Sequence, residues 1–249
     1  MLLDLLIKLP NLSSFELEVY DAGKWSGDEA LPVTVCPEIT SFKLRVQGIY
    51  MHTFPVGGSC MEEFMNAIRM PSLESYSISI ETNGLGESES KSIVWSQGTG
   101  ALSRALLPEH FSQSARMRSL YYDLRYNWEY SRMDDEPKVL LGASELHVPL
   151  DRFIHAATLI ISSFVQVLFT HNFDNKDSKS TDINKPHLRE LRFIGCENMT
   201  SAHLKRTIDS LELLGAWDDI ETVMVQECEH LNYEDVIAVV GDKRLQYFC

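Results

Sequence analysis

One short pattern of apolar residues occurs twice within residues 186–249, and it constrains the fold more than any other feature of the chain. The first copy starts at Leu188 and the second at Ile220, an offset of 220 − 188 = 32 residues. In both copies, apolar residues occupy positions +0, +3, +5, +11 and +16, and cysteine occupies position +8. A third copy starts at Leu245 and is cut short by the end of the sequence. A period of this size is typical of a repeat architecture, in which each unit packs on its neighbours.

The spacing inside the pattern predicts a strand, a turn and a helix. Positions +3 and +5 alternate, so their side chains point to one face of a short strand. Cys196 and Cys228 stand at position +8, where a small side chain that tolerates an apolar environment suits a buried turn. The apolar residues that follow predict helices over residues 201–214 and 233–240, with Thr200 or Ser201 capping the first. We expect these units to stack, because one unit cannot bury its apolar face alone.

The strand half of the pattern recurs earlier in the chain. It starts at Leu12, Ile39 and Leu73, and a proline lies two residues before each start, as Pro186 precedes Leu188. Proline fixes φ before the strand, where its missing N–H costs least. Two less regular copies start at Met117 and Ala143. The steps between the eight starts are 27, 34, 44, 26, 45, 32 and 25 residues, so we expect inserted helices or loops between some units.

Four connecting segments complete the prediction. Apolar residues at helical spacing predict a helix over residues 59–70 with Ser59 as its cap. Residues 82–100 are rich in Ser, Glu and Gly and predict a loop, whose lone Gly98-x-Gly100 is a weak phosphate-loop signal. Residues 153–169 are strongly apolar and predict a buried helix, while residues 172–185 predict a polar connection. The alternative for residues 153–169 is a membrane anchor, but polar side chains interrupt the run that a spanning helix needs.

Composition and charge narrow the classes of function. The chain has 249 residues, of which 44% are hydrophobic and 23% charged, which is ordinary for a folded protein. Its net charge of −14 argues against nucleic acid or an anionic membrane as the partner. The five cysteines are odd in number and widely spaced without a Cys-x-x-Cys pair, which indicates neither a disulfide framework nor a zinc site. We expect an intracellular protein, cytoplasmic or nuclear.

No motif for catalysis is recognisable. The sequence has no Gly-x-Ser-x-Gly elbow, His-Glu-x-x-His, P-loop or kinase signature, and its eight histidines are scattered. The repeat assigns Cys196 and Cys228 each to a turn of its own unit rather than to a metal. The interpretation is therefore a chain without catalytic residues, metal or cofactor.

The strand residues between the apolar positions are the candidate binding residues. In stacked strand-and-helix units they face the concave side, the surface that such proteins use to bind. Arg45, Tyr121 and Arg192 are the expected anchors, because arginine and tyrosine are enriched in binding hot spots. The full candidate set is Glu16, Glu18, Lys43, Arg45, Tyr121, Asp123, Arg192, Met224 and Gln226.

The paired pattern, Leu188-x-x-Leu191-x-Phe193-x-x-Cys196 and Ile220-x-x-Val223-x-Val225-x-x-Cys228, resembles the cysteine-containing leucine-rich repeat of F-box proteins. The irregular steps resemble fungal members of that group. This resemblance implies an α/β fold, an irregular leucine-rich-repeat solenoid with a curved parallel sheet and helices on its outer side. We expect one domain over residues 1–249, with irregular repeats in 1–150, a long helix and polar loop in 151–185, and regular cysteine-containing repeats in 186–249.

The resemblance also implies a function. F-box proteins with such repeats recognise a protein target and bridge it to a cullin-based ubiquitin ligase, so this chain is expected to be a substrate-recognition region whose partner is a protein. The F-box itself is not present in the sequence, and a ligase adaptor is a partner only if an F-box lies upstream. A stand-alone binding protein without a ligase link and an enzyme on a compact α/β fold are the alternatives.

Overall fold

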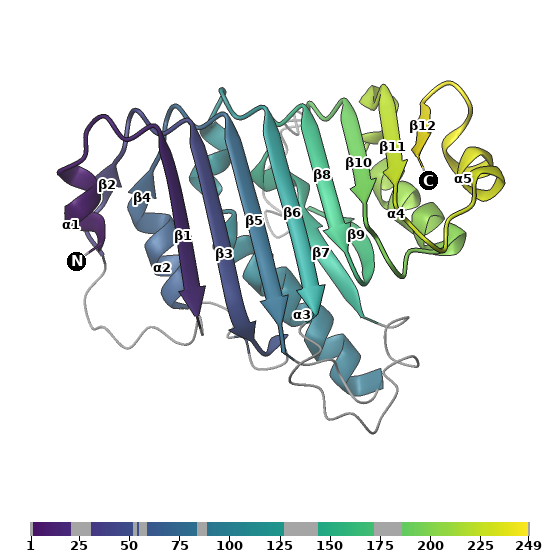
Figure 1. Cartoon of the computed structure of the whole chain (residues 1–249), viewed down its shortest axis with the longest axis horizontal. Helices are drawn as coiled ribbons and strands as arrows, with labels where there is room; N and C mark the ends of the chain where they lie inside the picture. The colour runs from purple at the N-terminus through teal and green to yellow at the C-terminus, as the bar shows by residue number, and fades with distance from the viewer. Residues whose placement is uncertain are drawn as a thin grey trace, which may run out of the picture.

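The main sheet of this α/β protein has eight strands, all parallel, in the computed structural model. The structure describes residues 2–20, 31–51, 54, 59–83, 89–126, 144–171 and 186–248. The strands lie in the sheet in their chain order (Figure 1). They are β1 (Ser14–Tyr20), β3 (Ser41–Ile49), β5 (Ser75–Thr82), β6 (Ser119–Tyr126), β8 (Thr158–Ser163), β10 (Glu190–Ile194), β11 (Thr222–Gln226) and β12 (Leu245–Phe248).

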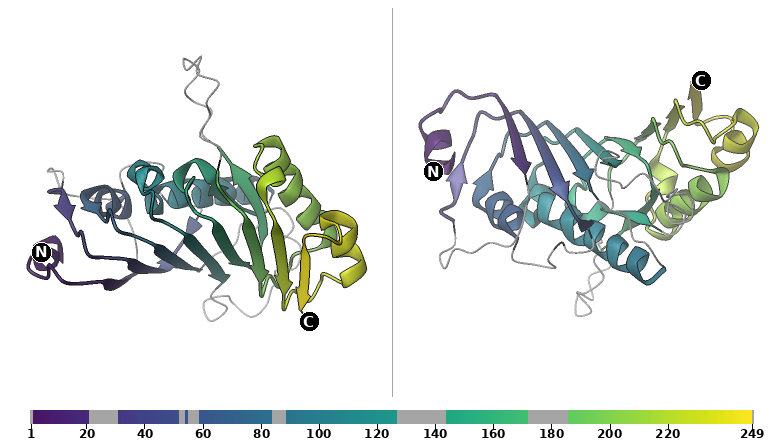
Figure 2. Two further views of the ribbon diagram at one scale, coloured as in Figure 1. Left: turned by 90° about the horizontal axis from the view of Figure 1, so that it is seen from above. Right: turned by 60° about the horizontal axis from the view of Figure 1, so that its bottom comes forward.

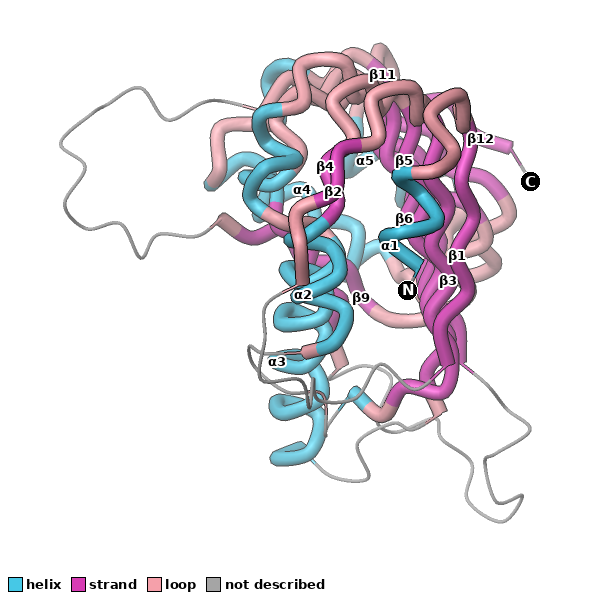
Figure 3. The backbone as a smooth tube through the Cα atoms, turned by 90° about the vertical axis from the view of Figure 1, so that its left-hand side faces the viewer, coloured by secondary structure: helices cyan, strands magenta, loops and turns pink. Residues whose placement is uncertain are grey.

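The first helix precedes β1 and the others lie in the connections between the strands, and the helices gather on one face of the sheet (Figures 1 and 2). In the described part of the chain, the opposite face carries no helix and is called the open face below. Two small parallel sheets also lie on the helical side: β2 (Thr34–Val35) with β4 (Ile68–Arg69), and β7 (Glu145–Pro149) with β9 (Gln166–Thr170). The helices are α1 (Leu2–Ile7), α2 (Cys60–Ala67), α3 (Glu89–Leu106), α4 (Ser201–Leu213) and α5 (Tyr233–Val240), with short 3-10 turns η2 (Glu109–Gln113), η6 (Leu150–Arg152) and η7 (Trp217–Asp219). Figure 3 shows the two layers edge-on.

The core consists of rows of apolar side chains that run across the strands. Paired registers place the +3 residues side by side, from Phe15 on β1 to Val223 on β11, and Leu245 on β12 joins this row. The predicted start of the third copy at Leu245 is therefore wrong by three residues, because Leu245 pairs with the +3 residue Val223. At the N-terminal end of this row, the rings of Phe15, Phe42 and Tyr76 stack with centroids 5.3 Å apart. Tyr76 is fully buried, and its hydroxyl donates to the carbonyl of Leu106 at 2.9 Å. The row therefore ties the sheet to the helical layer as well as strand to strand.

The predicted helices of the regular units are confirmed. α4 begins after Thr200, whose hydroxyl accepts from the backbone N–H of His203 at 3.3 Å. α5 covers the predicted residues and is capped by Asn232. α2 lies inside the predicted range, and its Ser59 cap accepts from the backbone N–H of Glu62 at 3.0 Å. These helix ends follow from local capping chemistry, which is why the sequence predicts them.

The predicted helix over residues 153–169 is wrong. This segment forms β8 and β9, joined by a turn in which Ser163 Oγ accepts from the N–H of Val165 at 3.2 Å. Ala156, Leu159 and Ile161 occupy the +0, +3 and +5 positions, and Leu159 and Ile161 join the buried rows of the main sheet. The fifth unit therefore starts at Ala156 rather than Ala143, and 188 − 156 = 32 repeats the step found between the regular units. β7, which contains Leu146 and Val148, pairs with β9 instead of entering the main sheet.

The predicted loop over residues 82–100 is also wrong in its second half, where α3 lies. Gly98 and Gly100 are inside this helix, so they form no phosphate loop. A Cβ on Gly98 would lie 1.9 Å from the carbonyl oxygen of Met51, so only glycine allows the helix to approach this backbone so closely. Trp95 is fully buried on the same helix. Packing against the rest of the protein outweighs the low helix propensity of the glycines and serines.

The predicted polar connection over residues 172–185 lies outside the described residues. Within the residues that the structure describes, no helix is both long and apolar enough to cross a membrane.

Candidate binding surface on the open face of the sheet

The candidate binding residues lie in two rows on the open face, because parallel pairing puts equivalent residues side by side. One row crosses all eight strands and contains Glu16, Lys43, Ser77, Tyr121, Ile160, Arg192, Met224 and Gln246. The neighbouring row contains Glu18, Arg45, Ser79, Asp123 and Ser162 on the first five strands and Ile194, Gln226 and Phe248 on the last three. With a strand spacing of about 4.8 Å, a row across eight strands extends for roughly 34 Å.

The first four strands bring part of the candidate set together around a shallow depression of about 370 Å³. Five predicted residues line it: Glu16, Lys43, Arg45, Tyr121 and Asp123. Glu18 lies beside it, where its Oε1 is 3.6 Å from Arg45 Nη1 and accepts from Gln47 Nε2 at 2.6 Å. The lining has acidic and basic groups in similar number, so the depression offers both donors and acceptors to a partner.

Asp123 is the most unusual group of this depression, because its carboxylate is buried. Oδ2 accepts from Arg125 Nε at 2.7 Å and from Ser79 Oγ at 3.2 Å. The other oxygen, Oδ1, is buried and accepts from no residue that the structure describes. A buried acceptor without a donor costs free energy, so a donor supplied by a water molecule or a ligand would stabilise this site.

The residues around Asp123 respond to its charge. Burial raises the pKa of Tyr121, and the nearby Asp123 carboxylate raises it further. The same carboxylate raises the pKa of Arg125, which therefore stays charged. At neutral pH the depression thus presents a protonated tyrosine hydroxyl and an arginine held against a buried aspartate. Both are groups that bind partners through directional hydrogen bonds.

The remaining candidates, Arg192, Met224 and Gln226, lie on β10 and β11, away from the depression. Arg192 forms an ion pair of 2.8 Å with Glu190, and Gln226 donates to Glu227 at 3.1 Å. β8 separates these strands from β6, and its outward Ile160 makes the middle of the row apolar. The nine predicted residues therefore form two groups on one face rather than a single pocket.

Ser77 and Ser79 also line the depression, and they lie in the two predicted rows although the candidate set does not include them. Sequence reasoning missed the other three lining residues, Gln47, Glu81 and Arg125. These three residues follow the +5 position in their strands. Open-face positions exist there only where a strand is longer than the strands of the regular units. β3, β5 and β6 have nine, eight and eight residues, against five in β10 and β11. The signal was present, because Phe42, Leu44 and Val46 continue the apolar alternation by one step and predict a longer strand.

The two repeat cysteines are buried structural groups. Cys196 Sγ lies 3.6 Å from the carbonyl oxygen of Ile161, and Cys228 Sγ lies 3.7 Å from that of Phe193, so each thiol donates to the preceding strand. Contact with Cys228 and burial raise the pKa of Cys196 well above its usual value, which keeps it a thiol. Among the described residues there is no group of three or more side chains that could hold a metal ion.

Comparisons with family models, with curated proteins and with solved structures found no match to this chain.

Proposed function

We propose that this chain is an irregular leucine-rich-repeat solenoid that binds another protein through the open face of its sheet. Three features support the proposal: strands in chain order, helices that all lie on one face within the described residues, and a long opposite face of mixed polar and apolar side chains. A surface with rows of roughly 34 Å fits an extended protein segment or a folded partner better than a small molecule.

The single observation that carries the proposal is the depression around Asp123. It combines a buried acceptor with no described donor, a tyrosine and three basic side chains, Lys43, Arg45 and Arg125, on the open face of the sheet. Tyrosine and arginine are the residue types that dominate binding energy in protein interfaces.

The ligase link is a narrower part of the same proposal. The paired cysteine-containing pattern supports an F-box-type receptor, in which this region would recognise the protein to be ubiquitinated. The test is a C-terminal tag on the native gene, followed by pull-down and mass spectrometry. A product that retains a ligase adaptor and a cullin supports the receptor function; retention of other proteins without them leaves a stand-alone binding protein.

Variants in the same pull-down test the surface itself. Arg45→Ala and Tyr121→Ala remove the two anchors of the depression, and Arg104→Ala removes an exposed arginine of α3 on the helical side as a matched control. Loss of a hot-spot side chain costs about 2 kcal/mol, or roughly 30-fold in affinity. The proposal predicts that retained proteins are depleted with the two face variants and kept with the control. Depletion with Arg104→Ala alone would place the binding surface on the helices.

A further inference from the structure

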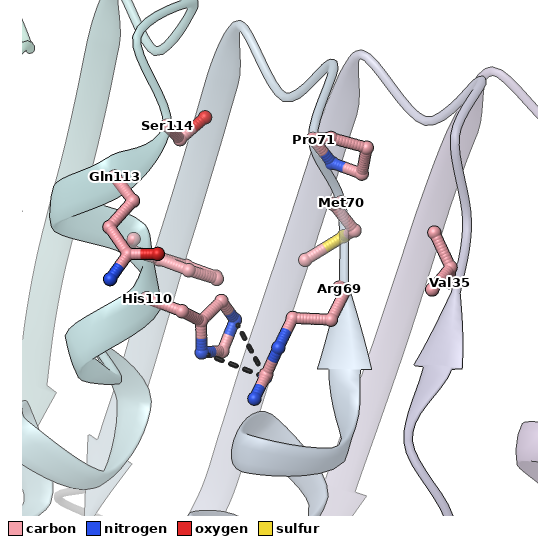
Figure 4. Close-up of a pocket in the computed structure, with 8 residues that line it drawn as sticks. Val35, Arg69, Met70, Pro71, His110, Gln113 and Ser114 are labelled. Atoms are coloured by element: carbon pink, nitrogen blue, oxygen red, sulfur yellow. Dashed lines mark hydrogen bonds between the residues drawn. The ribbon is translucent and has the colours of Figure 1, made fainter.

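A second cavity lies on the helical side of the sheet, remote from the open face. It has a volume of about 290 Å³ and is lined by Val35, Arg69, Met70, Pro71, His110, Phe111, Gln113 and Ser114 (Figure 4). Its two walls come from different units: the β2–β4 pair on one side and η2 on the other. The size is at the lower end of the range of about 300–1,000 Å³ found for small-molecule sites.

The backbone fixes both walls. Val35 pairs with Arg69 in the β2–β4 register, and the N–H of Cys36 donates to the carbonyl of Arg69 at 2.8 Å. On the opposite wall, the Phe111 ring packs edge-on against Tyr76 with centroids 5.3 Å apart, which anchors η2 to the buried rows. The side chains at the cavity are therefore held by the core and not by an exposed loop.

Arg69 is held in the cavity without an acidic partner. Its Nη1 donates to the carbonyls of Asn66 and Ile68 and to the His110 ring, 2.9 Å from Nδ1 and 3.3 Å from Nε2. Nε and Nη2 donate to no described residue, and no described carboxylate lies within salt-bridge distance. By contrast, six other arginines pair with acids: Arg45, Arg125, Arg152, Arg189, Arg192 and Arg206. In a chain with a net charge of −14, a partly buried guanidinium without an acid indicates a place for an external anion.

The other polar groups of the cavity are compatible with an anion. Burial and the adjacent Arg69 charge lower the pKa of His110 to about 4, so the ring is neutral at pH 7 and Arg69 carries the only charge of the lining. Ser114 Oγ is buried and bonds to no described residue, and the Gln113 amide lines the same cavity. Val35, Met70, Pro71 and Phe111 make the rest of the wall apolar.

We propose that this cavity binds a small carboxylate with an apolar body, the carboxylate on the Nε and Nη2 edge of Arg69 and the body against Val35, Met70 and Phe111. The planar guanidinium offers two parallel donors to a carboxylate, and its Nη1 contacts hold it in place before the ligand arrives. A free metabolite and the C-terminal residue of a peptide both supply this chemistry. The proposal is independent of protein binding at the open face.

The test is a titration of the full-length protein with 4-methylpentanoate. Calorimetry measures the affinity, and backbone amide chemical shifts locate the binding site. The uncharged 4-methylpentanamide has the same shape and serves as the matched ligand. N-acetyl-leucine peptides with a free or an amidated C-terminus distinguish a peptide source from a free acid. The proposal predicts at least tenfold weaker binding for each amide, and shift changes at the amides of Arg69, Met70 and residues 110–114.

Variants locate the site. Arg69→Gln is expected to weaken carboxylate binding at least tenfold and to leave the amide unchanged. Arg116→Gln removes a neighbouring exposed arginine that bonds to Ser72 outside the cavity and is expected to change neither. Equal affinity for acid and amide in the native protein would overturn the proposal, and so would no binding up to the solubility limit of the acid. Since this comparison uses the unmodified protein, it holds even if Arg69→Gln fails to fold.

Discussion

The first four strands of the sheet and the last three share the same buried rows but differ in length and in their open face. β3, β5 and β6 have eight or nine residues, and β10, β11 and β12 have four or five. A third inward row runs from the partly buried Val19 through Val46 and Ile80 to Leu124, and it is apolar only in the first four strands, because its next member on β8 is Ser163. Because these residues are buried or partly buried, the strands extend past the +5 position. The added strand residues on the open face then complete the lining of the depression. One added step of apolar alternation therefore decides where a polar depression forms on the opposite face.

The largest expected effect is on stability, and it tests whether the buried aromatic side chains of the first four strands and of the last three contribute equally to the free energy of unfolding. Phe42→Ala and Phe193→Ala each remove a fully buried ring, and each is expected to cost about 3–5 kcal/mol of unfolding free energy. Phe42 is also stacked between Phe15 and Tyr76, which adds about 0.5–1.5 kcal/mol for an aromatic pair. Urea unfolding measures both costs. A smaller cost for Phe42→Ala than for Phe193→Ala would show that the stacked rings contribute nothing beyond their burial.

A charge at the cysteine position tests the turn of the regular units. Cys196→Asp places a carboxylate where the side chain is fully buried, and it is expected to cost about 3 kcal/mol. Cys60→Asp is the matched control, because Cys60 is the first residue of α2, where an acid is favourable to the helix dipole. Thermal unfolding is the measurement. An unchanged midpoint for Cys196→Asp would contradict the buried turn, and a large loss for Cys60→Asp would show that the substitution destabilises the protein regardless of position.

The helix ends show what the sequence can predict, and residues 153–169 show what it cannot. Helix ends at Thr200, Asn232 and Ser59 follow from capping groups within three residues, so they are predictable. The apolar run over residues 153–169 is not, because a short buried strand and a buried helix have the same composition. Only the position of Ala156, 32 residues before Leu188, carried the information that a strand begins there.

The residues of the candidate sites also differ in whether the sequence predicts them. The alternation of single strands places the nine candidate residues within the two open-face rows. It did not place Ile160 and Ser162 of β8, because residues 153–169 were expected to form a helix. The missed residues depend on strand length, and the Arg69–His110 pair depends on packing between residues 41 positions apart. No local pattern joins those two residues, because β4 and η2 meet only once the helical layer has formed. Similarly, α3 forms despite Gly98 because that glycine packs against the backbone of Met51.

A smaller effect on the free energy of unfolding is expected at the residue before each repeat cysteine. Gly195 has φ +61° and Glu227 has φ 53°, so both units need a left-handed residue at this position. Gly195→Ala is expected to cost about 1–2 kcal/mol, because a Cβ meets no clash there and only the backbone conformation is unfavourable. Glu227→Gly is expected to stabilise by a similar or smaller amount, because it removes the same strain. Urea unfolding checks both signs, and a destabilising Glu227→Gly would mean that the glutamate side chain stabilises the turn more than the strain costs.

The smallest expected effect on stability comes from the contact between β7 and α4 of the regular units. Glu145 accepts from Arg206 Nη2 of α4 at 2.9 Å and lies 3.3 Å from the His147 ring. The hydrogen bond from His147 lowers the pKa of Glu145, and Arg206 lowers it further. Because the folded pKa lies below the unfolded value of about 4.3, the contribution to stability is present above that pH and is lost as the pH falls through the folded pKa.

Glu145→Gln is therefore expected to reduce the free energy of unfolding by less than about 1 kcal/mol at pH 7 and by progressively less below pH 4.3. Unfolding at several pH values compares the native protein with this variant. Lys205→Gln is the control, because it removes a charge of α4 whose partner Asp209 lies on the same helix. A difference between native protein and Glu145→Gln that persists at low pH would mean that Glu145 acts through packing, and that charge does not link β7 to α4.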